Sequence, residues 1–500
     1  NMKNFSFLVV CLLCFAFSSK ANNLTIGTTT YSSSNQTLTF TVAWDNSWSI
    51  SAGPSNWDAV WIFVKRQNCS GNNNWVHQLV STTSSDHLAQ TGGSTSSVVA
   101  VNAVSDGMGV FVRRIGTNVV GSVAAQTITL KLASTNPSIT TSNSDNFEVI
   151  GVEMVYVPQG QFYLGDGRPT NTNNFSAAST NQPLLVNATV QANGLGTYSN
   201  YVSNPAYGCS VPLPSTFPTG YNGYYCMKYE IQQGLVVEFL NTISYDQQAR
   251  VLAPWGRLPN VVNSYIDENW YYVNTRVITA GTYNTVPAVF YCAYPFIPQT
   301  HLNWTDLTAI LDWAGLRPMT EFEYEKACRG PLNPVAYEFP WGSTTINYMN
   351  NGNNSATAAY AVADGYCHGG GWNGGPIRSG FAAGAATNRS QAGATYYGIL
   401  DMAGQVYEQC IGGGNGYNYS TFTTVNGDGV LTANGAANVA NWPSEGGVNS
   451  GTILKGGFFN TGAGNYTQFQ ISDRQFLGGN NANRSDYKDR SMGGRGVRSF

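Results

Sequence analysis

The segment Arg317-Pro318-Met319-Thr320-Glu321-Phe322-Glu323-Tyr324-Glu325 contains a helix-start signal, and the rest of the chain is organised on either side of it. Glu323 follows Thr320 at the spacing of a capping box, in which each side chain accepts a hydrogen bond from the other residue's backbone N–H. The sequence therefore predicts a helix that begins directly after Thr320. Apolar residues at helical spacing predict two more helices upstream. The first contains Leu235, Val236, Phe239 and Leu240, and the second follows Asn303 with Leu307, Ile310, Leu311 and Ala314.

Several further blocks flank this segment in a fixed order. They are residues 151–165 (GVEMVYVPQGQFYLG), 226–231 (CMKYEI), 398–408 (GILDMAGQVYE), 455–459 (KGGFF) and 493–498 (GGRGVR). Together with the segment at 317–325 they resemble the signature blocks of the formylglycine-generating enzyme family, also called the sulfatase-modifying factor family. The block at 151–165 is similar to the family's opening strand pair, Met-x-x-Val-Pro-x-Gly-x-Phe-x-Met-Gly, with Leu164 in place of Met. The resemblance covers about residues 149–500.

The predicted fold class is α+β, with two domains after a signal peptide of residues 1–21. For residues 149–500 the resemblance implies the family's variant of the C-type-lectin fold, rich in irregular loops. Residues 22–147 are predicted to form a β-sandwich, because short apolar strands alternate with polar loops. The expected strands include residues 38–44, 59–64, 98–101, 109–112 and 128–130. Asp58, directly before the second of them, is expected to be a turn or edge residue.

The placement of cysteines decides the expected chemistry. The resemblance implies that active members carry two cysteines shortly after the block at 455–459, which bind copper and activate oxygen. Residues 411–500 of this chain contain no cysteine. A thiolate is both the soft copper ligand and the nucleophile, and Ser, Asn or Tyr cannot replace it. We therefore expect a pseudoenzyme, with no catalytic residue and no copper. A local disulfide between Cys209 and Cys226 is possible.

The resemblance also implies candidate calcium sites. Related proteins bind calcium at the positions that match Asp401, Gly404, Val406 and Glu408, through two side chains and two backbone carbonyls. Closely spaced oxygen donors along one loop suit Ca²⁺. The alternative is that Asp401 and Glu408 only accept hydrogen bonds from loop amides. A second set is implied at Asn347, Tyr348, Asp364 and Tyr366.

The C-terminal region is rich in amide and aromatic side chains. It resembles the variable region of lectin-fold proteins that are diversified by retroelements, and Tyr and Asn suit a binding surface. The candidate ligand-binding residues are Asn465, Tyr466, Asn483 and Tyr487. Arg474 and Arg498 match recurrent arginines of the family, and we expect both to be buried and hydrogen-bonded to carbonyls or carboxylates.

Composition and the N-terminal segment limit the partners and the compartment. Charged residues make up only 10% of the chain and the net charge is -3, which argues against a nucleic-acid partner. Residues 2–4 (MKN), the apolar run 5–17 and Ser19-Lys20-Ala21 together predict a cleaved secretion signal. The apolar run is too short to span a membrane, and no later segment is expected to do so. We therefore expect a secreted or cell-surface protein.

Three functions follow from these observations. The first is a non-catalytic extracellular component that self-assembles as a structural protein. The second is a ligand-binding surface protein, an adhesin or a diversified lectin-like protein, that recognises a cell-surface protein or glycan. The third is an active formylglycine-generating oxidase, against which the missing cysteines argue. Fold analogy alone does not separate the first two, and we expect the first.

Overall fold

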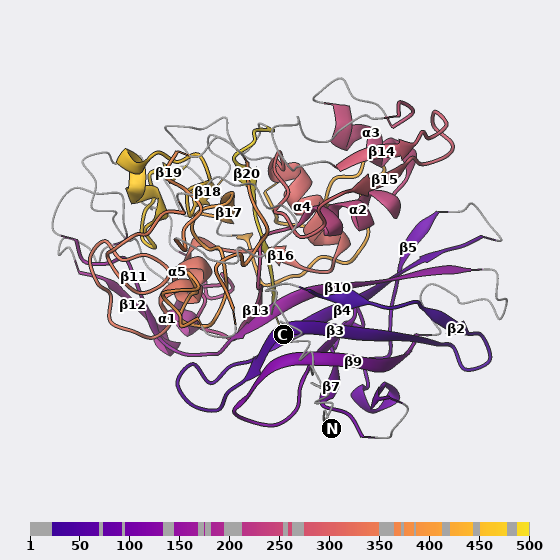
Figure 1. The fold of residues 1–500 in the computed structure, drawn as a ribbon, viewed down its shortest axis with the longest axis horizontal. Coiled ribbons are helices and arrows are strands. Elements are labelled where there is room, and N and C mark those ends of the chain that lie inside the picture. Colours follow the sequence, from indigo (N-terminus) through magenta and orange to yellow (C-terminus); the bar gives the residue numbers. More distant parts are fainter. Residues whose placement is uncertain are drawn as a thin grey trace, which may run out of the picture.

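The computed structural model describes residues 23–69, 74–92, 96–133, 145–168, 175, 182–194, 213–253, 259–262, 275–349, 365–371, 375–384, 387–412, 421–443, 451–477 and 488–499. These residues contain much more strand than helix, as expected for the predicted α+β class. Long strands of the N-terminal part form the lower portion of the molecule in Figure 1, and the helices and loops of the remaining chain lie above and beside them.

The first large sheet is antiparallel and belongs to the N-terminal part alone. Its strands run in the order β1-β3-β9-β6, with β2 also paired to β3. Their bounds are β1 (Thr25–Ile26), β2 (Thr30–Ser32), β3 (Thr37–Ser49), β6 (Leu88–Thr91) and β9 (Val119–Lys131). Leu38, Phe40, Val42 and Trp44 of β3 are buried at every second position, which is the period of a strand with one face in a core. The predicted strand at residues 38–44 is confirmed.

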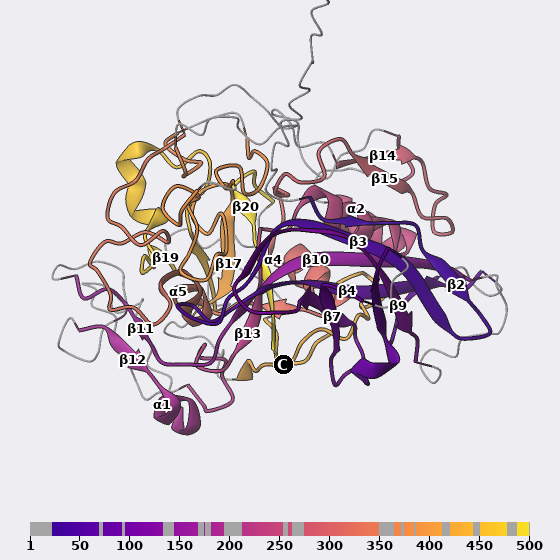
Figure 2. The same ribbon diagram turned by 60° about the horizontal axis from the view of Figure 1, so that its bottom comes forward.

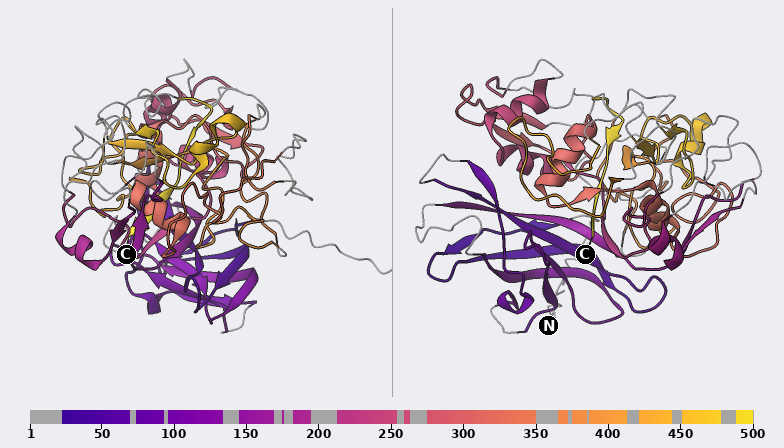
Figure 3. Two further views of the ribbon diagram at one scale, coloured as in Figure 1. Left: turned by 90° about the vertical axis from the view of Figure 1, so that its left-hand side faces the viewer. Right: turned by 180° about the vertical axis from the view of Figure 1, so that it is seen from behind.

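The second large sheet joins the N-terminal part to the rest of the chain. Its strands run in the order β16-β21-β13-β10-β4-β8-β7, with β5 also paired to β4. Their bounds are β4 (Asp58–Gln67), β5 (Trp75–Gln78), β7 (Val99–Ala103), β8 (Val110–Arg114), β10 (Asn146–Val157), β13 (Tyr224–Met227), β16 (Arg317–Pro318) and β21 (Gly496–Ser499). Strand β10 pairs with β4 along most of its length and with β13 near its end. The sheet therefore runs without interruption from the N-terminal strands to the closing strand β21. Figures 1 and 3 show the indigo and purple N-terminal strands below the rest of the chain.

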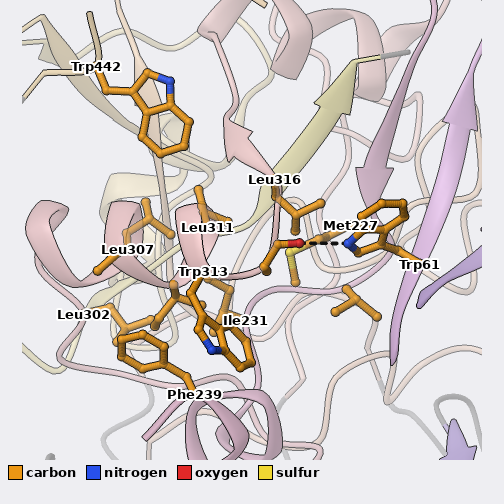
Figure 4. Packing of buried hydrophobic residues seen from close by; sticks show 14 of the residues in the cluster. Trp61, Met227, Ile231, Phe239, Leu302, Leu307, Leu311, Trp313, Leu316 and Trp442 are labelled. Atoms are coloured by element: carbon orange, nitrogen blue, oxygen red, sulfur yellow. Dashed lines mark hydrogen bonds between the residues drawn. The ribbon is translucent and has the colours of Figure 1, made fainter. Parts of the chain in front are cut away.

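Strand β4 is buried on both faces, as its continuous apolar run predicts. Val60, Ile62 and Val64 face the cluster that fills the space between the two large sheets. Trp61 and Phe63 face the larger cluster beneath the helices. The Trp61 indole Nε1 donates to the carbonyl of Ala314 at 2.9 Å, which ties this strand to the end of a helix of the second part (Figure 4).

The helices are few and short. They are α1 (Ala188–Asn193), α2 (Gln233–Asn241), α3 (Tyr245–Leu252), α4 (Trp304–Trp313) and α5 (Glu321–Arg329), with the 3₁₀ segments η1 (Ser84–Asp86) and η5 (Ala463–Phe469). Three of these, α2, α4 and α5, are the predicted helices. The capping box at Thr320 is formed: its hydroxyl accepts from the N–H of Glu323 at 3.1 Å, and Glu323 accepts from the N–H of Thr320 at 3.0 Å.

Smaller sheets complete the second part. The pairs are β11 (Phe162–Leu164) with β12 (Leu184–Val186) and β14 (Thr275–Thr279) with β15 (Val289–Cys292). A four-stranded sheet contains β17 (Tyr407–Ile411), β18 (Thr452–Lys455), β19 (Phe476–Leu477) and β20 (Met492–Gly493). The two strands of the predicted opening pair are present as β10 and β11. They do not pair with each other: β10 pairs with β13, and β11 pairs with β12.

Asp58 corrects one expectation. Its carboxylate accepts hydrogen bonds from Trp44 Nε1 at 3.0 Å, the Ser47 hydroxyl at 2.7 Å and the Trp48 N–H at 3.0 Å. It also lies 3.2 Å from the ammonium of Lys228. Asp58 is fully buried. The prediction of a turn or edge residue is therefore wrong, because the aspartate is the acceptor that satisfies four buried donors.

Buried arginines hold helix α5 in place. Its three glutamates each pair with an arginine: Arg474 with Glu321 at 2.8 Å, Arg317 with Glu323 at 2.5 Å, and Arg329 with Glu325 at 3.1 Å. Arg498 is also buried, beside the Gly315 carbonyl and Asp106. The expectation for Arg474 and Arg498 is confirmed. No helix within the described part of the chain is both long and apolar enough to cross a membrane.

Candidate functional site

The loop at residues 401–408 leads into strand β17 and contains the first predicted calcium set. Its backbone is tightly turned, with positive φ at Asp401 (56°), Gly404 (92°) and Gln405 (57°). A Cβ on Gly404 would lie 2.6 Å from the carbonyl oxygen of His368, so only glycine fits there. The loop is therefore held rigidly against a neighbouring segment.

The guanidinium of Arg495 lies in the middle of this loop. Its Nε donates to Glu408 Oε1 at 2.6 Å, and its Nη2 lies 2.6 Å from the same oxygen. Nη2 also donates to the Asp401 carbonyl at 3.2 Å, and Nη1 donates to the Met227 carbonyl at 3.1 Å. All these groups are buried. The positive charge at the centre of the site thus comes from the chain itself.

Glu230 is a third buried carboxylate at this site. It lies 3.9 Å from Arg495, and neither of its oxygens has a hydrogen-bond partner. Burial raises the pKa of Glu230 well above its usual range, and the charge on Asp401 adds to this, while Arg495 opposes it. Burial likewise raises the pKa of Asp401 to about 6, against the hydrogen bond from the Gly380 N–H at 2.5 Å. More carboxyl groups than cations are therefore buried here.

The residues of the first set do not fit Ca²⁺ in this arrangement. Calcium needs six to eight oxygens at about 2.3–2.6 Å, but Arg495 takes Glu408 Oε1 and the Asp401 carboxylate accepts from the Gly380 N–H. An ion at these oxygens would also lie against a guanidinium cation. The alternative reading, in which Asp401 accepts from a loop amide, agrees with its bond to Gly380. Within the described residues, no three His, Cys, Asp or Glu side chains are grouped to hold a metal ion.

The second predicted calcium set is only partly described. The Asn347 carbonyl accepts from the N–H groups of Tyr366 and Cys367, at 3.0 and 3.2 Å, and Tyr348 is joined to Cys367 by a parallel β-bridge. Tyr366 donates from its hydroxyl to the Thr345 carbonyl at 3.3 Å. The structure thus brings Asn347, Tyr348 and Tyr366 together. Asp364 lies outside the described residues.

The predicted ligand-binding residues are also divided. Asn465 and Tyr466 lie in η5, where Asn465 is exposed and the Tyr466 side chain is 48% exposed. Asn483 and Tyr487 lie outside the described residues. The structure therefore places one Asn-Tyr pair at the surface, and the relation of this pair to the other two residues stays a prediction.

The described cysteines are nearly all buried thiols. Cys226, Cys328, Cys367 and Cys410 are fully buried and free, whereas Cys69 is exposed. Cys209, the other half of the possible Cys209–Cys226 disulfide, lies outside the described residues. Burial raises the pKa of Cys226 to about 12 and raises those of Cys328, Cys367 and Cys410 as well. These thiols are protonated near neutral pH, and a thiol is a poor nucleophile and metal ligand.

Comparison with known proteins agrees with the sequence blocks around this site. The model of the sulfatase-modifying factor enzyme 1-like domain matches residues 144–498. The chain belongs to this family.

The formylglycine-generating enzyme of Thermomonospora curvata is 31% identical over 116 residues, which are 23% of this chain and 33% of that protein. The formylglycine-generating enzyme of Bos taurus is 45% identical over 49 residues, which are 10% of this chain and 13% of that protein. The matched segments thus span a third or less of these relatives. Among solved structures, the major tropism determinant U1 variant aligns with 84% of this chain and 85% of its own, at 11% identity and a TM-score of 0.24.

Sequence reasoning missed two residues of the site, Arg495 and Glu230. Arg495 lies 87 positions from Glu408, and Glu230 stands between Tyr229 and Ile231, which are both buried. The available signal is the low charge of the chain. Where charged residues are only 10% of the total, a charge inside an apolar stretch is a candidate for a buried ion pair.

Proposed function

We propose that this protein is a non-catalytic, secreted or cell-surface component that self-assembles on a sulfatase-modifying-factor-like scaffold. The proposal includes an N-terminal β-sandwich and a C-type-lectin-like second domain. The loss of catalysis is supported by the absence of cysteine from residues 411–500 and by the burial of Cys226, Cys328, Cys367 and Cys410. Chemistry that needs two accessible thiolates has no candidate pair among the described cysteines.

Self-assembly is supported by one surface, the hairpin β14–β15. Strand β15 alternates, with Val289 and Tyr291 exposed and Phe290 buried against the core. Ile278, Tyr283 and Val286 of the same hairpin are 45–69% exposed. The hairpin lies at the edge of the molecule, away from the large sheets (Figure 2). Soluble monomers rarely expose such grouped apolar side chains, which mark interaction sites.

A polymer needs a heterologous interface that does not close into a ring. A projecting apolar hairpin can supply one half of such an interface by packing against a different surface of the next copy. Negative-stain electron microscopy of the purified protein tests the proposal directly. Filaments or sheets are expected, and a monodisperse monomer at all concentrations contradicts self-assembly.

Loss of catalysis has its own test. A cysteine-containing sulfatase peptide is incubated with the protein, oxygen and copper, and the mass of the peptide is then measured by mass spectrometry. The peptide is expected to remain unmodified. Conversion of its cysteine to formylglycine would overturn the pseudoenzyme assignment and leave the assembly question open to the imaging result.

A second candidate function is binding of a cell-surface protein or glycan. The observation that favours it is the exposed pair Asn465 and Tyr466 on η5. A glycan and protein-partner screen with Tyr466→Ala as the comparison variant separates this function from assembly, because Tyr466 belongs to η5 and not to the β14–β15 hairpin.

A further inference from the structure

A cavity of about 590 Å³ lies between the N-terminal strands and the second part of the chain. One wall is strand β10, and the opposite wall is helix α2 with the segment at residues 227–232 that precedes it. Figure 1 shows α2 above strand β10 of the shared sheet. Strand β1 and the loop after it complete the lining. The cavity has the volume of an ordinary small-molecule site.

Four glutamates line this cavity, and no Lys, Arg or His is among its described lining residues. Glu148 and Glu153 come from β10, Glu230 comes from the segment before α2, and Glu238 comes from α2 itself. Gly234, Leu235 and Glu238 share one face of α2, because residues three and four apart lie on the same side of a helix. The fold therefore brings acids from two separate stretches of the chain to one cavity.

Buried polar atoms without partners lie around the deep end of the cavity. Glu230 is fully buried, and neither of its carboxylate oxygens accepts a hydrogen bond. Oε1 of Glu153 and the hydroxyl of Tyr229 also lack a hydrogen-bond partner, and these two residues are only 5% and 4% exposed. Buried polar groups are almost always hydrogen-bonded, so several unpartnered ones at one cavity point to a missing ligand.

Two neighbouring cations, Lys228 and Arg495, are shared with acids outside the cavity lining. Lys228 lies 2.9 Å from Glu153 Oε2, but it is shared with Asp58 at 3.2 Å. Arg495 lies 2.6 Å from Glu408 and only 3.9 Å from Glu230. Glu148 and Glu238 have no ion pair among the described residues. Buried charge that is not paired is costly, so the cavity favours protonation or a bound cation.

Apolar side chains also line the cavity, which narrows the class of cation. They are Leu24, Ile26, Val149, Leu235 and Phe296, and they stand with the acids beside the polar residues Thr28, Thr29 and Gln232. A metal ion needs oxygens gathered at about 2.3–2.6 Å, and the described acids do not form such a group. An organic cation with a hydrocarbon body instead matches separated carboxylates with apolar walls between them.

We propose that the cavity between β10 and α2 binds a small organic dication, an alkyl diamine of the putrescine or cadaverine kind. One ammonium pairs with the deep acids Glu153 and Glu230, and the other with Glu148 and Glu238 nearer the rim. The alkyl chain lies along Leu235 and the other apolar walls. The site stands whether or not the protein assembles, because its lining does not include the β14–β15 hairpin.

Binding is expected to release protons. Burial raises the pKa of Glu238 to about 7, and the charge on Glu148 adds to this. Burial also raises the pKa values of Glu148, Glu153 and Glu230. The other charged or titratable groups that face the cavity, lie close behind it or act on its acids are Tyr229, Lys228, Arg495, Asp45, Asp58, Asp401, Glu408 and Arg378, which stacks on Phe296. An ammonium favours the charged carboxylates, so protons leave as it enters.

The test is calorimetric titration of the purified protein with putrescine and cadaverine at pH 7, in two buffers of different ionisation enthalpy. Saturable binding is expected, with a heat that depends on the buffer because protons are released. Butanediol, the uncharged analogue, is expected not to bind, and calcium chloride is expected not to displace putrescine. Absence of diamine binding, equal binding of butanediol, or displacement by calcium would each overturn the proposal.

Variants locate the site. The double substitution Glu148→Gln and Glu238→Gln is expected to weaken putrescine binding at least about tenfold and to abolish the buffer dependence. The matched control is Asp246→Asn on α3, an exposed acid outside the cavity lining, which is expected to bind as the native protein does. Both glutamate substitutions remove carboxylates whose charge opposes folding, so unfolding is not expected, and circular dichroism checks this. Equal affinity of the double variant and the control would contradict the site.

Discussion

Arg495 Nη2 lies 2.6 Å from Glu408 Oε1, and both side chains are excluded from solvent. This ion pair joins the loop at residues 401–408 to the closing strand β21, which begins one residue later. The guanidinium also binds the carbonyls of Asp401 and Met227. The chain thus places a cation of its own beside the residues for which the family resemblance implies calcium.

Replacing Arg495 by a neutral side chain of similar length tests how much its ion pair contributes to the free energy of unfolding. Arg495→Met leaves Glu408 and Glu230 buried without a cation, so we expect a loss of about 3–5 kcal/mol in the free energy of unfolding. The control is Lys131→Met, a partly exposed lysine, with an expected loss below about 1 kcal/mol. Denaturant unfolding measures both. Equal losses would show that the buried pair is not the stabilising element.

Calcium should have little effect on the native protein. Arg495 pairs with Glu408 Oε1, and the Asp401 carboxylate accepts from the Gly380 N–H, so we expect the melting temperature to be the same in chelator and in millimolar calcium. In Arg495→Met the cation beside Glu408 is removed, and added calcium is expected to raise the melting temperature. A fall of the native melting temperature in chelator would instead support the predicted calcium set.

The stability of the protein should change with pH because Glu238 titrates at different pH values in the folded and unfolded states. Its pKa is about 7 in the folded chain against an ordinary value of 4.5, so between these values the folded state binds more protons than the unfolded state. Protonated Glu238 therefore raises the free energy of unfolding at low pH, and this contribution to stability is lost as the pH rises through about 7.

Glu238→Gln removes this titration. Without added diamine, the variant is expected to melt at the native temperature near pH 4.5 and above the native temperature at pH 8, when Glu238 is charged. Thermal scans across this range check the prediction. A variant less stable than the native protein at pH 8 would show that charged Glu238 has a favourable partner.

Thiol labelling tests the burial of the cysteines. In the folded protein an alkylating reagent is expected to modify Cys69 rapidly and to leave Cys226, Cys328, Cys367 and Cys410 unmodified. All of them should react after unfolding. Peptide mass spectrometry reads the sites separately, and rapid modification of Cys410 or Cys367 in the native state would argue for an accessible thiol and against the pseudoenzyme proposal.

Local sequence signals predicted local structure well. Helix α5 follows from Thr320 and Glu323, and both capping bonds are formed. Strand β4 follows from its apolar run. Such features depend on residues a few positions apart, whose propensities and hydrogen bonds act within one element.

Long-range partners could not be predicted in the same way. Asp58 was misread because its cation, Lys228, lies 170 positions away. The cavity acids Glu148 and Glu238 come from a strand and a helix that only the tertiary fold brings together. The role of Arg495 likewise depends on the pairing of β21 with β13. In each case the chemistry is set by topology, which a single sequence does not specify.

The most direct test of the proposed function is electron microscopy of the native protein beside Tyr291→Asp, which places a charge on the exposed face of β15. The control is Val425→Asp, an equally drastic change at an exposed apolar residue outside the β14–β15 hairpin. We predict ordered polymers for the native protein and the control, and dispersed particles for Tyr291→Asp. Single particles in all three samples would contradict self-assembly, and polymers in all three would contradict the hairpin as its interface.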